Sequence, residues 1–406
     1  SGLADGSYSS SFGAGLNTDV TSLFTDVKVS GATGSLRFNT FGAQTLTIGG
    51  ASDAQQTIVE SGGIMVTPAV GAFDITITDQ NRGNEELFGG GAFGVERELI
   101  VHQHNTRGTL TINATIGDNG GPSRLTKTGQ GTLILTKLNT YSGQTAIYGG
   151  VLQLNTGGIL GGASQPLINH GYLVINRSSI TLPQIIEGTG ILRQAGAGIT
   201  TLNSDNTYTG PTQVLAGTLA ISNAGNALGS TAGLTSVSSG ATLSFSNVVV
   251  PETIVLKGGS TLRTSPSAGS STLNGSLILG GNSTITLGGS SSPLRLNGRV
   301  FAMQGSQLTV NGTGRLLLGN AANHFNGISL GAGTQLLLGA EPLLDNNPLT
   351  IAPAVAGAAG RAPIVNNGTV ITNTNNGHMV LGNAISGSGN FIQVRNTLYL
   401  TADNTY

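Results

Sequence analysis

A stretch of thirty residues recurs along this chain at a constant spacing, and that repetition constrains the fold more than any other feature. Residues 125–154 read LTKTGQGTLILTKLNTYSGQTAIYGGVLQL, and residues 192–221 repeat the pattern 67 positions later. A third copy runs from Gly314 to Leu336 with one inserted residue, and a fourth begins at Leu398. A recurring strand–turn–strand unit is typical of a solenoid, in which each unit buries its apolar face only by stacking on its neighbours.

The copies share corner glycines and an Asn followed two residues later by an aromatic residue. We expect the Asn side chains to bond between coils at a corner and the aromatic residues to pack over that corner. The shared positions are Gly129, Gly131, Asn139, Tyr141, Gly143, Gly196, Gly198, Asn206, Tyr208, Gly210, Asn323, Phe325, Gly327, Asn404 and Tyr406.

From residue 44 onward, short segments of alternating apolar and polar residues are each closed by Gly, Pro, Asp or Asn. Such alternation predicts strands with one face inward, and no window of helical length shows a helical apolar stripe. We therefore predict an all-β protein, a parallel β-helix of roughly 18 coils of about 22 residues each, forming one elongated rod. Residues 1–43 are predicted to be an irregular N-terminal segment or cap with short strands, and residues 44–406 a continuous solenoid whose C-terminal repeat is cut short.

Two places interrupt this regularity. Ala352 to Ala362 is rich in Pro, Gly and Ala and is predicted to be a loop or a single turn. The Asn-Gly pairs at Asn274 and Asn297 are typical of two-residue hairpins, so antiparallel pairing remains open locally.

Composition excludes several classes of function. Net charge is −1 and charged residues are 9% of the chain, so there is no electrostatic footprint for nucleic acid and no basic face for a membrane surface. The apolar runs are far shorter than the roughly 18 residues that a spanning helix needs. The absence of Cys fits a reducing compartment and an exported bacterial protein equally well. Because the chain starts at Ser1 without Met or a signal peptide, we expect a processed form or an excerpt of a longer protein.

The unit L-x-K-x-G-x-G-T-L-x-L-x-x-x-N-T-Y-x-G at Leu125 resembles the autotransporter-associated β-strand repeat, also called the passenger-associated transport repeat. Residues 98–121 are similar to the rungs that lead into such repeats. The second copy departs from the first at Gln194 and Thr200. The resemblance implies a right-handed parallel β-helix passenger, exported by a type V pathway to the cell surface or the extracellular space. A C-terminal β-barrel translocator, expected of an autotransporter, is missing from the sequence, so whether the passenger is anchored or shed stays open.

Phosphate-binding, zinc-protease, Cys-x-x-Cys and calcium-repeat motifs are all missing from the sequence, and we predict no cofactor. One zone, residues 74–107, concentrates charge and two histidines. On an extended strand Glu96, Glu98, Ile100, His102 and His104 share one face, while Val95, Leu99 and Val101 share the other. His102 and His104 are weak candidates to ligate Zn²⁺ with a carboxylate, and Glu and His could act as acid and base. The alternative favoured here is the solvent face of an ordinary rung. The charged and His residues of the zone are Asp74, Asp79, Arg82, Glu85, Glu86, Glu96, Arg97, Glu98, His102, His104 and Arg107.

The tyrosines offer a further alternative, because a flat aromatic ring on a β-helix face can stack on a sugar. Packing over a corner is favoured for those in the Asn-Thr-Tyr repeats, since they recur with the structural unit. The tyrosines in question are Tyr141, Tyr148, Tyr172, Tyr208, Tyr399 and Tyr406.

Two functional hypotheses follow. The first is a non-catalytic bacterial surface protein, structural or adhesive, that binds host or environmental glycans or proteins. The second is a β-helical carbohydrate-active enzyme, a polysaccharide lyase or glycosidase, which would need acids clustered on adjacent coils. Outside residues 74–107 the acids are spread thinly along the chain, which makes such clustering unlikely there and favours the first. The last copy stops at Tyr406, and Ser1-Gly2 would continue it, so we expect further copies or subunits that stack end to end into a fibre.

Overall fold

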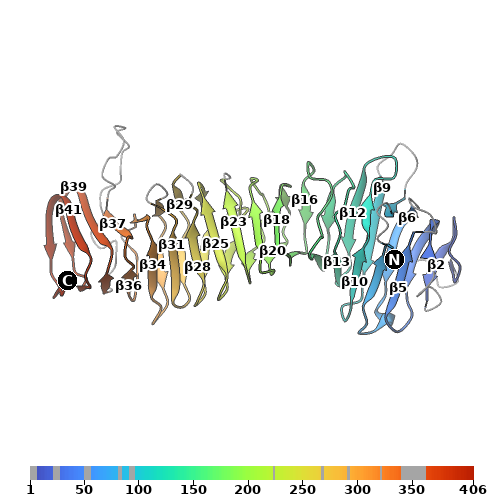
Figure 1. Cartoon of the computed structure of the whole chain (residues 1–406), viewed down its shortest axis with the longest axis horizontal. Helices are drawn as coiled ribbons and strands as arrows, with labels where there is room; N and C mark the ends of the chain where they lie inside the picture. The colour runs from blue at the N-terminus through green and yellow to red at the C-terminus, as the bar shows by residue number, and fades with distance from the viewer. Residues whose placement is uncertain are drawn as a thin grey trace. The chain divides into compact units, whose positions relative to one another are not determined.

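The structure is a computed structural model, and it describes residues 7–21, 28–49, 56–80, 85–90, 97–222, 225–266, 269–289, 293–320, 322–339 and 363–406. The loop predicted at residues 352–362 lies outside these ranges. The chain divides into two compact units, Ser1–Ala195 and Gly196–Tyr406, each of which is an all-β stack (Figure 1). Helical structure in the described ranges is limited to Ser7 and the 3-10 turn η3 (Pro68–Val70), and no helix there is long and apolar enough to cross a membrane.

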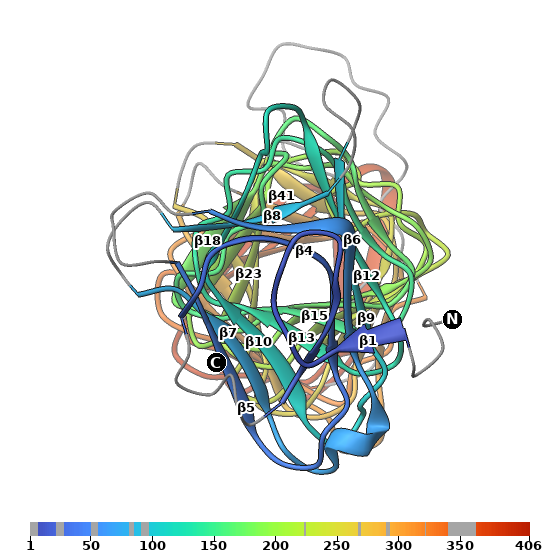
Figure 2. The same ribbon diagram turned by 90° about the vertical axis from the view of Figure 1, so that its right-hand side faces the viewer.

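Unit 1 contains two long sheets, which lie on different sides of each coil in Figure 2. The strands of sheet 1, in spatial order, are β1 (Tyr8–Ser9), β2 (Asn17–Val20), β4 (Gly31–Phe38), β6 (Thr57–Val66), β9 (Arg97–Gln103), β12 (Ser123–Thr128), β14 (Thr145–Ile147), β16 (Leu167–Asn169) and β19 (Ile186–Glu187). In addition, β8 (Glu86–Gly89) pairs with β6, and β11 (Thr115–Gly117) pairs with β8. The strands of sheet 2 are β3 (Lys28–Val29), β5 (Gln44–Ile48), β7 (Ile75–Thr78), β10 (Thr109–Asn113), β13 (Thr132–Leu135), β15 (Val151–Leu154), β17 (Tyr172–Ile175) and β20 (Ile191–Gln194). A further strand, β18 (Ser179–Leu182), completes the unit.

Unit 2 contains strands in three sheet positions around each coil. The first holds β22 (Thr212–Val214), β24 (Leu234–Val237), β27 (Thr253–Leu256), β30 (Leu277–Leu279) and β33 (Val300–Ala302). The second holds β21 (Ile199–Leu202), β23 (Thr218–Ser222), β25 (Thr242–Ser246), β28 (Thr261–Thr264), β31 (Ser283–Leu287), β34 (Leu308–Gly312), β36 (Ile328–Leu330), β38 (Ile364–Asn366) and β40 (Ile385–Ser386). The third holds β26 (Val249–Val250), β29 (Ser271–Leu273), β32 (Leu294–Leu296), β35 (Arg315–Leu318), β37 (Gln335–Gly339), β39 (Thr369–Leu381) and β41 (Asn390–Leu400).

Strand neighbours are parallel and come from successive coils, which confirms the predicted β-solenoid. Inward residues therefore lie directly above one another. In unit 1 a single column runs through β10, β13, β15, β17 and β20, and every member is a buried leucine: Leu110, Leu133, Leu152, Leu173 and Leu192. In unit 2 a matching column consists of Leu219, Leu243, Leu262, Ile285, Val310 and Leu330. Each side chain in such a column is covered from both sides, so apolar burial is obtained only by stacking.

The predicted number of coils was wrong, because the chain makes about 13 turns rather than roughly 18. Coils within the repeats are slightly shorter than the predicted length, since Thr132 pairs with Val151 only 19 residues later. Other coils are longer: Gly63 pairs with Ile100, 37 residues later. This interval contains β7 and also β8, so additional segments within such a coil use residues that a constant period assigns to extra coils.

The predicted boundary at residue 43 remains a proposal. Strands β2 and β4 lie before it and already pair in parallel register, Thr18 with Leu36, while β4 pairs with β6. The parallel stack thus includes strands on both sides of residue 43.

The Asn-Gly pairs of unit 2 form corners between parallel strands instead of hairpins. Asn297 Nδ2 donates to Asn274 Oδ1 at 3.0 Å, and Asn320 Nδ2 donates to the carbonyl oxygen of Asn297 at 3.3 Å. The side chains therefore form a ladder from coil to coil. Antiparallel pairing among the described residues is limited to one isolated bridge, between Gly90 and Glu98.

Glycine is required at these corners because the backbone of one coil lies directly on the next. A Cβ atom at Gly298 would lie 1.9 Å from the carbonyl oxygen of Gly275, and a Cβ at Gly275 would lie 1.9 Å from that of Glu252. Neither contact can be relieved by rotating a side chain. The corner glycines thus set how closely successive coils approach.

We predict that Gly298→Ala lowers the free energy of unfolding of unit 2 by about 1 to 3 kcal/mol, the usual effect of forcing extra volume into a packed site. Gly258→Ala is the matched control, because the nearest atom to its Cβ would be 3.6 Å away. Urea unfolding followed by circular dichroism measures both variants. Equal midpoints for the two variants would contradict the role assigned to corner contact.

Candidate functional site

The charged zone predicted at residues 74–107 contains strand β9, which has the predicted alternation. Leu99 and Val101 are fully buried, whereas Glu98, Ile100 and His102 are partly exposed. Glu96, together with Val95 and Arg82, lies outside the described residues. The outward face of β9 is therefore the place where any chemistry of this zone has to occur.

His102 and His104 lie side by side on this face, with parallel rings whose centroids are 6.2 Å apart. His102 Nδ1 is 2.7 Å from Thr128 Oγ1 on the next coil. Burial lowers the pKa of His102, and the neighbouring His104 lowers it further. In the described part of the chain no group of three or more His, Cys, Asp or Glu side chains is placed to hold a metal ion. The two histidines thus have no third ligand of these types there.

The acids of the zone bind separate partners instead of converging. Asp74 Oδ1 accepts hydrogen bonds from the backbone N–H and hydroxyl of Thr109, at 2.7 and 2.9 Å. Glu85 is buried and accepts from the backbone N–H of Gln80 at 2.6 Å. The remaining contacts join neighbouring coils or segments: Asp79 with Lys137, Glu86 with Thr140 and Glu98 with Thr126. Except for Glu85, whose bond is local, these carboxylates therefore join two parts of the stack.

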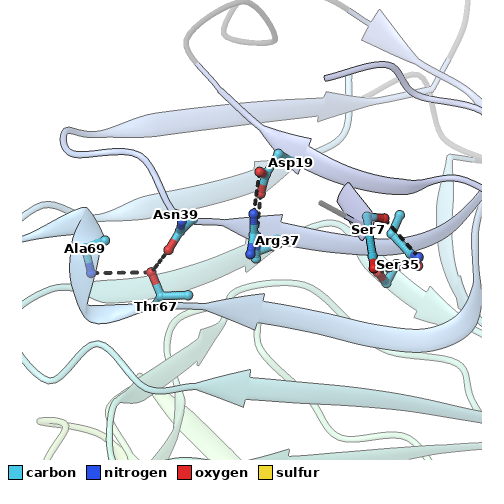
Figure 3. Close-up of polar contacts among 8 residues, drawn as sticks. Ser7, Asp19, Ser35, Arg37, Asn39, Thr67 and Ala69 are labelled. Atoms are coloured by element: carbon cyan, nitrogen blue, oxygen red, sulfur yellow. Dashed lines mark hydrogen bonds and ion pairs between the residues drawn. The ribbon is translucent and has the colours of Figure 1, made fainter. Parts of the chain in front are cut away.

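The same outward face begins with a column of polar bridges between coils (Figure 3). Arg37 donates through Nε and one terminal nitrogen to the two carboxylate oxygens of its register partner Asp19, both at 2.6 Å. Beside this pair, Thr67 Oγ1 donates to Asn39 Oδ1 at 2.5 Å and accepts from the N–H of Ala69 at 3.3 Å. These contacts fix the first coils and the start of η3 relative to one another.

The predicted corner asparagines all form bridges to other strands or coils. Asn139 Oδ1 accepts from the N–H of Ile116 at 3.0 Å, and its Nδ2 donates to the carbonyl oxygen of Ile159 at 2.7 Å. One side chain thus joins the preceding and following coils. The equivalent bonds are Asn206 Nδ2 to Ala227 O at 2.6 Å, Val300 N to Asn323 Oδ1 at 2.8 Å and Ile385 N to Asn404 Oδ1 at 2.9 Å.

The tyrosines of the Asn-Thr-Tyr motifs in the first two repeats are inside the stack. Tyr141 and Tyr208 are buried, and each phenol oxygen lies 2.6 Å from a threonine hydroxyl, Thr145 or Thr212. Burial raises the pKa of both tyrosines well above the usual range. Neither ring is available to a sugar, so the stacking alternative does not apply to them. Phe325 is also buried, whereas Tyr406 is half exposed.

The predicted glycines of the repeats lie where coils touch. A Cβ at Gly131 would lie 2.1 Å from Asn105 O, and one at Gly129 or Gly143 would lie 2.3 Å from a carbonyl oxygen. In the second repeat the carbonyl oxygens of Gly196 and Gly198 lie against Gly217, and that of Gly210 lies against Gly233. Gly327 has more room, with its nearest neighbour at 3.5 Å.

A second corner motif was missed at the sequence level. Asn169 Oδ1 accepts from the N–H of Gly171, and its Nδ2 donates to Ile191 O in the next coil. Asn366 makes the same two bonds, to Gly368 N and Asn390 O. In both cases the next coil brings a Gly-x-Gly against the Asn carbonyl group. The signal is Asn-x-Gly followed about 20 residues later by Gly-[Thr/Ser]-Gly, at residues 169–190 and 366–389.

The lysine of the repeat motif is wholly buried. Lys127 Nζ donates to the carbonyl oxygens of Thr128, Gly129 and Gly149 at 2.7 to 3.1 Å. Burial lowers its pKa to about 8. All three ammonium donors therefore satisfy corner carbonyls, and the second repeat replaces this lysine with buried Gln194.

Exposed aromatic residues remain on the outer faces. In unit 1, Tyr148 is 59% exposed and stacks on His170, with centroids 6.0 Å apart. Arg193 lies over the ring of Tyr172, 5.1 Å from its centroid. In unit 2, Tyr399 is half exposed. Tyr148, Tyr172 and Tyr399 therefore lie at surfaces that a partner can reach.

Comparison with known proteins agrees with the repeat architecture. The Passenger-associated-transport-repeat family matches residues 125–154 and 192–221, which are the first two copies. The adhesin BmaC autotransporter of Brucella suis biovar 1 (strain 1330) is 33% identical over 229 residues, covering 47% of this chain and 6% of the relative. The chain thus spans a small part of that relative's length. No solved structure matches the chain significantly.

We predict that Asn139→Asp destabilises unit 1 by about 1 to 3 kcal/mol at neutral pH, because a carboxylate oxygen would then face the carbonyl of Ile159 in place of an N–H donor. Asn176→Asp is the control, since Asn176 is exposed. Urea unfolding midpoints at pH 7 compare the two. A loss no larger than that of the control would show that the bridge contributes little.

Proposed function

We propose that the chain is part of an autotransporter passenger exposed at the cell surface or in the extracellular space, and that it acts as a non-catalytic adhesive β-solenoid. The observation that carries the proposal is the likeness to an adhesin over nearly half of this chain. On this proposal the buried columns keep the stack rigid, and the outward faces contact host or environmental glycans or proteins.

The placement of the acids supports a non-catalytic role over the lyase or glycosidase alternative. General acid–base chemistry needs two or three titratable groups within reach of one substrate bond. Asp74, Asp79 and Glu98 each bind a different partner, and Glu85 is buried. These carboxylates act as ties within the stack.

We predict that beads coated with the full chain are retained on surfaces bearing extracellular-matrix proteins or polysaccharides, whereas albumin-coated beads wash off. The same preparation should leave polygalacturonate and other anionic glycans uncleaved. Glu96→Gln and Glu98→Gln serve as the enzymatic control. Glycan cleavage that either substitution abolishes, or retention equal to that of albumin, would contradict the proposal.

The coil at residues 390–406 supports a second part of the proposal, association end to end. Leu400 has the inward position of its register partner Leu381, yet it is 37% exposed while Leu381 is 2% exposed. Phe391, the partner of buried Val370, is also partly exposed. These apolar side chains lack the next coil that covers their equivalents elsewhere. We propose that a further coil, from a longer polypeptide or from a second copy, pairs here.

We predict that the 406-residue chain at micromolar concentration forms end-to-end particles in electron micrographs, and that Leu400→Asp shortens them. Ile392→Asp is the control, because Ile392 is exposed on the outward face of the same strand, opposite in alternation to Phe391. Particles that stay separate for the unsubstituted chain, or that shorten equally with both variants, would argue against pairing through this coil.

A further inference from the structure

A carboxyl group lies inside unit 2 without a hydrogen-bond partner. Glu252 precedes β27 and is 1% exposed, and its neighbours in the alternation, Val250 and Ile254, are buried as well. Neither carboxyl oxygen of Glu252 has a partner within hydrogen-bond geometry. An ionised carboxylate in such a place loses its hydration without compensation, so this position favours the neutral acid.

The groups that face Glu252 offer no positive charge. Thr235, the register partner of Ile254, is buried, and its hydroxyl lies beside Glu252, where it favours the ionised form of the carboxyl group and so lowers its pKa, although the two groups do not meet hydrogen-bond geometry. The titratable group facing Glu252 is Tyr208, whose pKa the negative charge of Glu252 helps to raise. The groups among the described residues that shift the pKa of Glu252 include no Lys, Arg or His.

The same corner of unit 1 holds a neutral amide. Leu182-Pro183-Gln184 corresponds to Val250-Pro251-Glu252, two coils after each tyrosine repeat. Gln184 is buried and its Nε2 donates to the carbonyl oxygen of Gly161 at 3.1 Å. The position therefore accommodates a hydrogen-bond donor.

The carbonyl that accepts this bond has a counterpart in unit 2. Gly161 packs against Tyr141, and Gly229 packs in the same way against Tyr208. A protonated Glu252 can donate toward that corner as the Gln184 amide does, whereas the carboxylate has no proton to donate.

From this geometry we propose that Glu252 is a proton-operated latch, which holds the coils of β24 and β27 together as a neutral acid and loosens them when it ionises. The ligand that regulates it is the proton itself. The latch is confined to unit 2, because the equivalent residue in unit 1, Gln184, has an amide side chain that does not titrate. It does not depend on what the protein adheres to.

The sign of the pH dependence follows from burial. Burial raises the pKa of Glu252 from 4.5 to about 7, while the Thr235 hydroxyl acts in the opposite direction. The folded state therefore binds the proton more tightly than the unfolded state. The stabilisation is complete below pH 4.5 and is lost as the pH rises toward 7. Between pH 4.5 and pH 7 the ratio of folded to open forms falls about tenfold per pH unit.

Hydrogen–deuterium exchange of the full chain tests the latch. We predict that protection factors of peptides covering β24 and β27, corrected for intrinsic exchange, fall as pH rises from 5 to 7.5. Glu252→Gln should remove that fall. The converse variant, Gln184→Glu, should create a similar fall in peptides covering β16 and β19 of unit 1. Flat protection in the unsubstituted chain, or an unchanged fall in Glu252→Gln, would overturn the proposal.

A titration of the unsubstituted chain gives an independent test, because it does not require a Glu252 variant to fold. Carboxyl ¹³C shifts of the Glu-labelled chain should contain one resonance with a midpoint near pH 7, and Gln184→Glu should add a second one. If every glutamate resolved from unit 2 titrates near the ordinary value of 4.5, the latch does not exist.

Discussion

The structure depends on one constraint, which is that successive coils stack in register at the spacing of a parallel sheet, about 4.8 Å. An inward side chain is then buried by its equivalents in the coils before and after it, as in the leucine column from Leu110 to Leu192. The backbone at the corners must approach just as closely. That is why Gly131 and Gly298 have no space for a Cβ atom and why buried amides and an ammonium group satisfy the corner carbonyls.

This constraint separates the inside of the stack from its outside. Some buried polar residues bridge coils, as Asn139 does between two coils and Lys127 does among three carbonyls. Glu252 differs from these because it is a buried carboxyl group with both oxygens outside hydrogen-bond geometry, so its environment depends on its protonation state. Outward positions such as Tyr148 and His170 are free to vary, and adhesion is a function that such a surface can acquire without changing the core.

Much of the fold follows from the sequence because strand alternation and corner glycines are local signals. The repeats at residues 125 and 192, the inward side of β9 and the bridging asparagines were all visible in this way. Coil number was not, because some coils, such as the one from Gly63 to its register partner Ile100, are much longer than those of the repeats and no periodic signal predicts their length. The Asn169 and Asn366 corners were missed because each depends on residues about 20 positions apart, which only the register brings together. The equivalence of Gln184 and Glu252 was missed because it becomes apparent only from their places before β19 and β27.

The register itself can be measured by disulfide trapping, since the chain contains no Cys. Ile134 and Gln153 are register partners on adjacent coils, at a separation that suits a disulfide, whereas Ile134 and Asn155 are diagonal neighbours about 7 to 8 Å apart. We expect Ile134→Cys with Gln153→Cys to oxidise quickly and completely, and Ile134→Cys with Asn155→Cys to oxidise slowly. Equal rates, or faster closure of the diagonal pair, would contradict the register on which the whole account rests.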